Sequence, residues 1–91
     1  MPLLTGNLFG TVVDQQGEPL PGVTVILSEI GAPQIQITNA EGQFRFLDLS
    51  PGKYTVTAQL EGFSTVEYPN VEINVGRNTS LEIKMSPATE E

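Results

Sequence analysis

The sequence predicts an all-β fold, a seven-stranded antiparallel β-sandwich with Greek-key connections. Apolar and polar residues alternate with a period of two through most of residues 8–85, which is typical of half-buried strands. Clusters of Gly, Pro, Asn and Asp separate the alternating stretches at short intervals, as in all-β sandwiches. No stretch has the apolar period of an amphipathic helix, so essentially no α-helix is expected.

Each expected strand carries a row of alternating apolar side chains. The first strand is expected at about residues 8–13. The apolar rows of the later strands are, in chain order, Val23, Val25 and Leu27; Ile35 and Ile37; Phe44 and Phe46; Tyr54, Val56, Ala58 and Leu60; Val71, Ile73 and Val75; and Leu81, Ile83 and Met85. In the fourth strand Phe44 and Phe46 are expected to point inward and Arg45 outward, so that two sheets bury one core.

Two short segments predict tight turns with the same chemistry. Asp14-Gln-Gln-Gly17 suits a tight hairpin in which Gly17 takes the positive φ that other residues disfavour. Asn39-Ala-Glu-Gly42 repeats this pattern. These residues are therefore expected to shape the backbone.

Prolines mark further boundaries between strands. Ser50-Pro51-Gly52 places proline and glycine at the second and third positions of a type II turn, where each is preferred. Pro69 is expected between strands, where its missing N–H costs no ladder hydrogen bond.

A chain of 91 residues has room for one domain, which we expect at residues 7–86. Residues 1–6 are expected to form a flexible N-terminal segment. Residues 87–91 are expected to form a linker-like tail, which indicates that more chain follows in the native protein. The first residues have neither the basic region nor the apolar stretch of a signal peptide.

The composition argues against catalysis and against several classes of partner. The chain has no histidine and no cysteine, so no catalytic site, no metal site and no cofactor is expected. Eleven acidic residues against four scattered basic ones give a net charge of −7, which makes nucleic acid a poor partner. No apolar run approaches the ~20 residues of a membrane helix, so the domain itself is not expected to be membrane-embedded.

Weak calcium binding by the turns is an open alternative. Asp14, Glu18, Glu41 and Asp48 lie in or near expected turns, and calcium takes several oxygen ligands. These carboxylates do not have the spacing of a calcium loop, and Asp or Asn ahead of Gly is ordinary turn chemistry. A structural role in the turns is therefore the preferred interpretation.

The turn formers and core residues together make a long, gapped signature. It runs G-T-V-V-D-Q-Q-G-E-P-L-P-G-V-T-V from Gly10, E-G-Q-F-R-F from Glu41, L-S-P-G-K-Y-T-V from Leu49 and E-G-F from Glu61. Its conspicuous members are Gly10, Asp14, Gly17, Pro21, Gly22, Gly42, Phe44, Phe46, Pro51, Gly52, Tyr54, Gly62 and Phe63. The signature resembles the carboxypeptidase regulatory-like domain family over roughly residues 7–86. This resemblance implies a transthyretin-like (prealbumin-like) sandwich of the carbohydrate-binding-like fold group.

The family that the chain resembles has mixed functions, all of which imply a non-catalytic role here. Its members include accessory domains of carboxypeptidases, repeats of bacterial surface proteins and N-terminal extensions of TonB-dependent outer-membrane receptors. Residues 70–85 are especially similar to the last two strands of those receptor extensions. The resemblance thus implies a structural or interaction module of an exported bacterial protein, at the periplasmic side of the outer membrane or at the cell surface. Its expected partner is another protein or the rest of its own chain.

Two other functions remain open. The chain could be a carbohydrate-binding accessory module of a secreted enzyme, or a spacer repeat of a surface protein. A glycan site would need exposed aromatic rings. Tyr54 and Phe63 are expected in the core, which leaves Tyr68, beside Pro69, as the candidate ligand contact.

Overall fold

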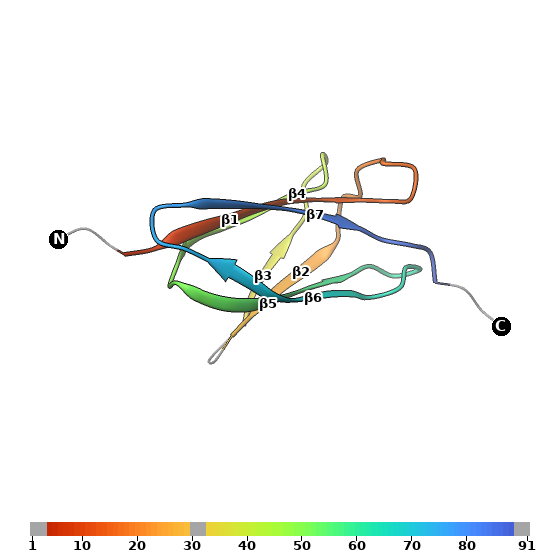
Figure 1. Ribbon diagram of the computed structural model, residues 1–91. Helices are drawn as coiled ribbons and strands as arrows, with labels where there is room; N and C mark the ends of the chain where they lie inside the picture. Colours follow the sequence, from red (N-terminus) through yellow and green to blue (C-terminus); the bar gives the residue numbers. More distant parts are fainter. Residues whose placement is uncertain (1–3, 30–32, 89–91) are drawn as a thin grey trace.

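A computed structural model describes residues 4–29 and 33–88, and shows two facing β-sheets (Figure 1). One sheet has three strands in the order β4-β1-β7, and the other has four in the order β3-β2-β5-β6. The strands are β1 (Gly6–Val13), β2 (Thr24–Ser28), β3 (Gln34–Ile37), β4 (Gln43–Leu49), β5 (Gly52–Gln59), β6 (Val66–Ile73) and β7 (Asn78–Lys84). Within the described residues there is no helix, and hence none that could cross a membrane. The predicted all-β, seven-stranded sandwich is confirmed.

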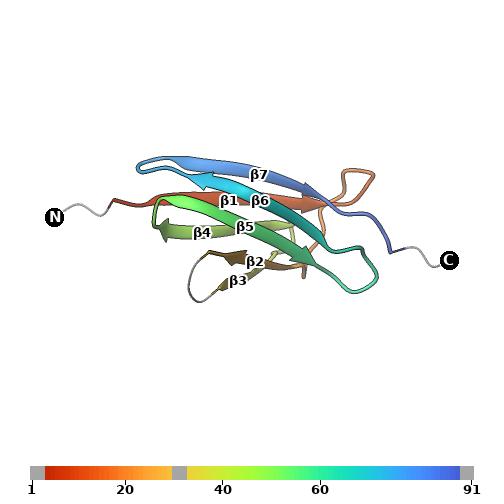
Figure 2. The ribbon, with the colours of Figure 1, turned by 60° about the horizontal axis from the view of Figure 1, so that its bottom comes forward.

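One pairing departs from the antiparallel prediction. β1 pairs with β7 in parallel, whereas the other four pairings are antiparallel. The chain enters β7 by crossing from β6 in the opposite sheet, not through a hairpin from β1 (Figure 2). A crossing of this kind permits either direction, whereas a tight hairpin forces an antiparallel pair.

The core lies between the sheets and is built from the alternating rows. Its buried members are Leu8, Val12, Val23, Val25, Leu27, Phe44, Phe46, Leu49, Tyr54, Val56, Ala58, Ile73, Ile83 and Met85. Phe44 and Phe46 meet edge to face, with ring centroids 5.9 Å apart and planes at 62°, a favoured aromatic geometry. Burying each large apolar side chain contributes about 1.5–3 kcal/mol to the hydrophobic driving force, so these rows define which face of each strand is inside.

Strand β3 does not bury its apolar row. Ile35 and Ile37 are 57% and 54% exposed, so the half-buried strand that the sequence predicts here is wrong. The register pairs them with Ile26 and Thr24 of β2, on the outer face of the four-stranded sheet. All residues of β3 are exposed on both faces, so the opposite, three-stranded sheet does not cover this edge strand.

Strand β6 begins earlier than the sequence predicts and contains Pro69. It ends at Ile73, and Val75 is 47% exposed in the turn before β7. The β5–β6 register shifts between Tyr54 and Val56, opposite Pro69 and its neighbour Asn70, which has a φ of 61°. Pro69 is therefore tolerated inside the strand, contrary to the prediction, because it occupies an irregularity on an edge strand.

Both ends of the described chain make backbone hydrogen bonds to other segments. The Thr5 C=O accepts the Gly76 N–H at 2.9 Å, and β1 already begins at Gly6. Beyond β7, the Ser86 C=O accepts the Ser64 N–H at 2.9 Å, and the Ala88 N–H donates to the Gly62 C=O at 3.0 Å. The start of the predicted linker-like tail thus lies against the β5–β6 connection. Residues 1–3 and 89–91 of the predicted flexible ends lie outside the described residues.

Candidate interaction surface

The signature residues are spread over turns and core and do not converge on one surface. Asp14 and Asn39 occupy equivalent turns: the Asp14 Oδ1 accepts the N–H groups of Gln16 and Glu18, both at 2.9 Å. The Asn39 Oδ1 accepts the N–H groups of Glu41 at 3.0 Å and Gln43 at 2.9 Å. The glycine that ends each turn has a positive φ, 84° at position 17 and 73° at position 42. Both turns therefore have the predicted chemistry.

Glycine at position 10 makes room for an aromatic ring. Gly10 lies opposite Phe44 in the β1–β4 register, and a Cβ built on Gly10 would clash with the Phe44 ring. The same Cβ would lie 2.8 Å from the backbone oxygen of Leu81 on β7. The central strand of the three-stranded sheet therefore has no room for a side chain at this point, and glycine is needed at position 10 for packing.

Thr38 fixes the Pro21-Gly22 segment, a role that no local sequence pattern indicates. Its Oγ1 accepts the Val23 N–H at 2.8 Å and donates to the Leu20 C=O at 2.7 Å. The Gly22 N–H donates to the Thr38 C=O at 3.1 Å. Thr38 is a buried polar residue, and its partners lie 15 and 18 positions away, beyond any local pattern. These bonds satisfy the groups that burial would otherwise leave unpaired.

Tyr54 anchors the connection between β4 and β5. Its side chain is buried and its hydroxyl donates to the Ser50 C=O at 2.6 Å. Burial, followed by the charge of Glu29 and a hydrogen bond to it, raises the pKa of Tyr54 above its ordinary value of 10.0. Gly52, after the exposed Pro51, has a φ of 153°. A type II turn needs about +80° there, so the predicted turn type is wrong.

The remaining signature residues and Tyr68 lie around the β5–β6 hairpin. Gly62 is exposed with a φ of 89°, and the half-buried Phe63 forms an isolated bridge to Pro87. Tyr68 lies within β6, half-buried and packed against the core. Tyr54, Phe63 and Tyr68 therefore present no row of fully exposed rings on the described surface.

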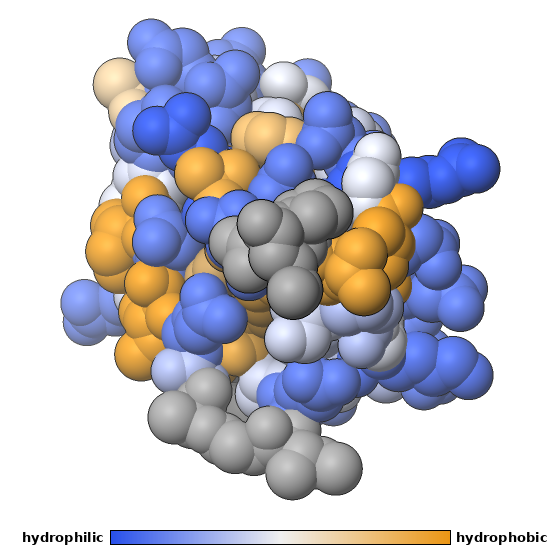
Figure 3. Space-filling model, turned by 90° about the vertical axis from the view of Figure 1, so that its left-hand side faces the viewer, coloured by the Kyte–Doolittle hydropathy of each residue, from blue (hydrophilic) through white to orange (hydrophobic). Residues whose placement is uncertain are grey.

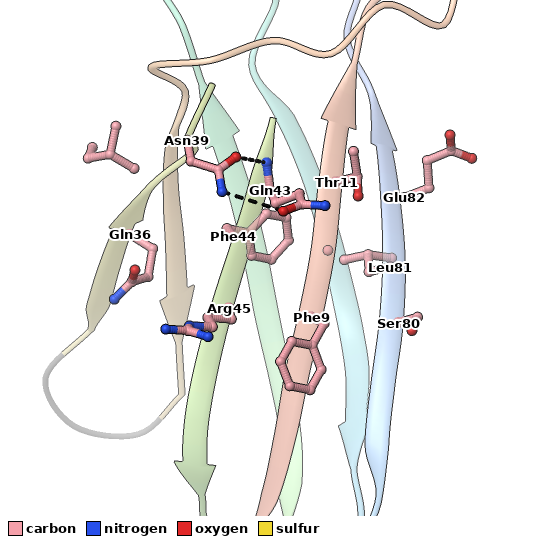
Figure 4. A pocket seen from close by; sticks show the side chains of 12 residues that line it. Phe9, Thr11, Gln36, Asn39, Gln43, Phe44, Arg45, Ser80, Leu81 and Glu82 are labelled. Carbon is pink, nitrogen blue, oxygen red and sulfur yellow. Dashed lines mark hydrogen bonds between the residues drawn. The ribbon is translucent and has the colours of Figure 1, made fainter. Parts of the chain in front are cut away.

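A depression lies over the outer face of the three-stranded sheet. It has a volume of about 890 Å³ and extends from β7 across β1 and β4 to β3. Figure 4 shows Arg45 reaching from β4 toward the β3 side, where Gln36 lies, with Phe9 on β1 beside it. Glu82 lies at the β7 end, so one cationic and one anionic side chain line opposite sides of the depression. The sequence analysis did not single out these residues, because outward positions of a strand carry no recognisable motif.

A second open feature is the uncovered edge and outer face at β3. Large exposed hydrophobic residues are Leu4, Ile35, Ile37, Leu47 and Val75, and two of the five belong to β3. Figure 3 shows that apolar side chains form separate patches among hydrophilic ones on the end of the sandwich that it views. Within residues 4–29 and 33–88, no group of three acidic, histidine or cysteine side chains is arranged to hold a metal ion.

Comparisons with known proteins agree with this geometry. The chain matches the carboxypeptidase regulatory-like domain over residues 7–86. It is 26% identical over 86 residues to the TonB-dependent transporter Oar of Myxococcus xanthus, a match that covers 91% of this chain and 8% of the transporter. The chain therefore spans only a small part of that relative's length.

Two solved structures illustrate the fold. The Bacillus anthracis TIE protein superposes with a TM-score of 0.79 at 22% identity, over 93% of this chain and 17% of that protein. The 5-hydroxyisourate hydrolase of Klebsiella pneumoniae superposes with a TM-score of 0.70 at 25% identity, over 92% of this chain and 87% of the enzyme. Because the family match extends over nearly all of the described sandwich, the chain belongs to the carboxypeptidase regulatory-like domain family.

Proposed function

We propose that this chain is a non-catalytic interaction module, and that it forms the periplasmic N-terminal extension of a TonB-dependent receptor in the outer membrane. The observation that carries the proposal is the similarity to the transporter Oar, which extends over 91% of this chain. The fold suits such a role, because a sandwich with uncovered strand edges offers backbone groups to a partner segment. The partner is another protein or the rest of the same chain.

The likeness to a hydrolase does not support catalysis in this chain. Similar folds host unrelated functions, and activity depends on the residues of the site. This chain contains no histidine and no cysteine. The family match and the similar transporter both point to a non-catalytic domain.

Cysteine labelling in whole cells tests the proposed location. The chain has no cysteine, so Thr65→Cys, at an exposed position, gives one reporter thiol within this domain of the full parent protein. A membrane-impermeant maleimide is expected to label it only after the outer membrane has been permeabilised. Labelling in intact cells would place the domain on the cell surface and favour a spacer repeat. Labelling that requires rupture of the inner membrane would contradict export.

A carbohydrate-binding module is the second candidate, and the depression favours it. The half-buried ring of Phe9 lines it together with the amides of Gln36 and Gln43 and the hydroxyl of Ser80. An apolar platform with a few polar groups around it is typical of small-ligand sites. A glycan array with the wild-type chain and with Phe9→Leu tests this candidate: a hit that Phe9→Leu weakens supports it, and an array without hits removes it.

A further inference from the structure

The edge strand β3 is the least protected edge of the described sandwich. At the opposite edge of the same sheet, β6 carries Pro69, an irregular register and the charged Glu67 and Glu72. In the other sheet, the β4 edge carries Arg45 and is interrupted by Asp48, which has a φ of 58°, and the β7 edge carries an acidic and a basic side chain. Natural sheets blunt their edges with prolines, charges and bulges of this kind. β3 has none of them: its sequence is Gln-Ile-Gln-Ile.

The backbone groups that β3 leaves unpaired belong to its two isoleucines. The Thr38 N–H donates to the Val23 C=O at 3.0 Å, and the register continues through Val25 opposite Gln36. Hydrogen-bonded and non-hydrogen-bonded pairs alternate along an antiparallel ladder, so Gln34 and Gln36 bond to β2. The N–H and C=O groups of Ile35 and Ile37 therefore face away from β2. No strand among the described residues lies on that side.

From this arrangement we propose that β3 pairs antiparallel with β3 of a second copy of the same chain, about a twofold axis at Gln36. In this register Ile35 lies opposite Ile37 of the partner copy, and Ile37 lies opposite Ile35 of the partner copy. Each outward N–H and C=O of the two isoleucines then finds a partner. The pairing joins two four-stranded sheets into one continuous sheet and rests on the proposal that the uncovered edges of this module are recognition surfaces.

Side-chain chemistry on both faces fits a second copy. On the outer face, Ile35 and Ile37 extend the half-buried Ile26 of β2, so the twofold joins two apolar patches. On the other face, Gln36 meets Gln36 of the partner copy, and two amides can both donate and accept. A register shifted by one residue would place isoleucine beside glutamine on each face, and would interrupt both the isoleucine row and the glutamine row.

Charge narrows the choice of surface. Each copy has a net charge of −7, so like copies repel wherever acidic residues face one another. β3 is uncharged along its whole length, and its β2 neighbours Thr24 and Ile26 are uncharged as well. Self-association is therefore least opposed at this edge, and screening by salt strengthens it.

The contact is small, so the dimer is weak. A strand of only four residues buries far less than the ~1,200–2,000 Å² of a standard stable interface. We expect half-dimerisation at a chain concentration on the order of 0.1–1 mM, corresponding to about −4 to −5.5 kcal/mol. Raising the salt from ~50 mM to ~500 mM should tighten it several-fold.

Sedimentation equilibrium of the 91-residue chain from ~10 μM to ~1 mM tests the proposal at the concentrations where a contact of this size would associate. Ile35→Lys and Ile37→Lys are each expected to raise the dissociation constant at least tenfold, because a charged edge blocks strand addition. Val75→Lys is the matched control: it makes the same change of charge at a position 47% exposed, outside β3, and should leave the dimer unchanged. Circular dichroism confirms that each variant is folded, and Ile35→Thr keeps an uncharged β-former at the edge if a lysine variant does not fold.

Two results overturn the proposal. One is a wild-type chain that stays monomeric at ~1 mM in high salt, where screening leaves little repulsion. The other is a dimer that survives in the folded Ile35→Lys and Ile37→Lys variants, which would assign the contact to another surface. Neither result bears on the periplasmic location, which the cysteine-labelling experiment tests independently.

Discussion

Glycine at position 42 is required for two separate reasons, backbone conformation and space. Its φ of 73° lies in the left-handed region, where a residue with a Cβ pays roughly 1–2 kcal/mol. A Cβ there would also lie 2.6 Å from the Val12 backbone oxygen and 3.0 Å from the Leu20 backbone nitrogen. Gly17 ends the equivalent turn at Asp14 and has a φ of 84°, but nothing lies within 4 Å of its Cβ position. The two positions therefore separate the conformational cost from the steric one.

We predict that Gly42→Ala destabilises the domain more than Gly17→Ala. Gly17→Ala should cost about 1 kcal/mol, from conformation alone. Gly42→Ala should cost a further ~1–3 kcal/mol, because the new methyl group crowds backbone atoms of Val12 and Leu20, and the backbone has to shift to make room. For a domain of this size each kcal/mol lowers Tm by roughly 4–8 °C. Thermal unfolding of the two variants measures the difference, and equal losses of stability would show that the crowding at position 42 has no energetic weight.

At the level of single strands, the sequence predicts which face is buried wherever the opposite sheet covers the strand. Val23, Val25 and Leu27 are buried as expected, and so are Phe44 and Phe46. The period-two pattern carries this information because burial on one face of a pleated strand repeats at every second residue. The Asp14 and Asn39 turns were predictable for a similar reason, since their hydrogen bonds span at most four residues.

Strand neighbours and edges were not predictable from local pattern. Ile35 and Ile37 alternate with glutamine as a half-buried strand would, yet both are exposed at the edge of the sheet. Pro69 argues against a strand, yet it lies in one, because its missing N–H falls at an irregular point of an edge. The exposure of β3 depends on how the other strands pair, and the sequence of β3 itself carries no information about those pairings. The candidate contact surface is therefore the part of this protein that only the three-dimensional arrangement identifies.

At the level of the whole molecule, Tyr54 links stability to alkaline pH. Its hydroxyl ties β5 to the Ser50 carbonyl, and its pKa in the folded chain is raised by burial and by Glu29. Folding therefore favours the neutral phenol over the phenolate. The stabilisation is fully present below the unfolded pKa of about 10 and is lost as the pH rises through the higher pKa of the folded state.

We predict that the wild-type chain loses more stability than Tyr54→Phe does between about pH 9 and about pH 11.5, a range that includes the ordinary tyrosine pKa of 10.0 and extends about 1.5 units above it. At pH 7 the variant should be about 0.5–1.5 kcal/mol less stable, because it lacks the bond to Ser50, and the gap should narrow or reverse at alkaline pH. Urea unfolding across this range measures both curves, and lysine titration cancels in their difference. Glu29→Gln should weaken the pH dependence without abolishing it, since burial is the larger cause of the raised pKa. Parallel curves for the wild type and Tyr54→Phe would mean that the phenol is solvated in solution and that the Tyr54 contact contributes nothing to the coupling.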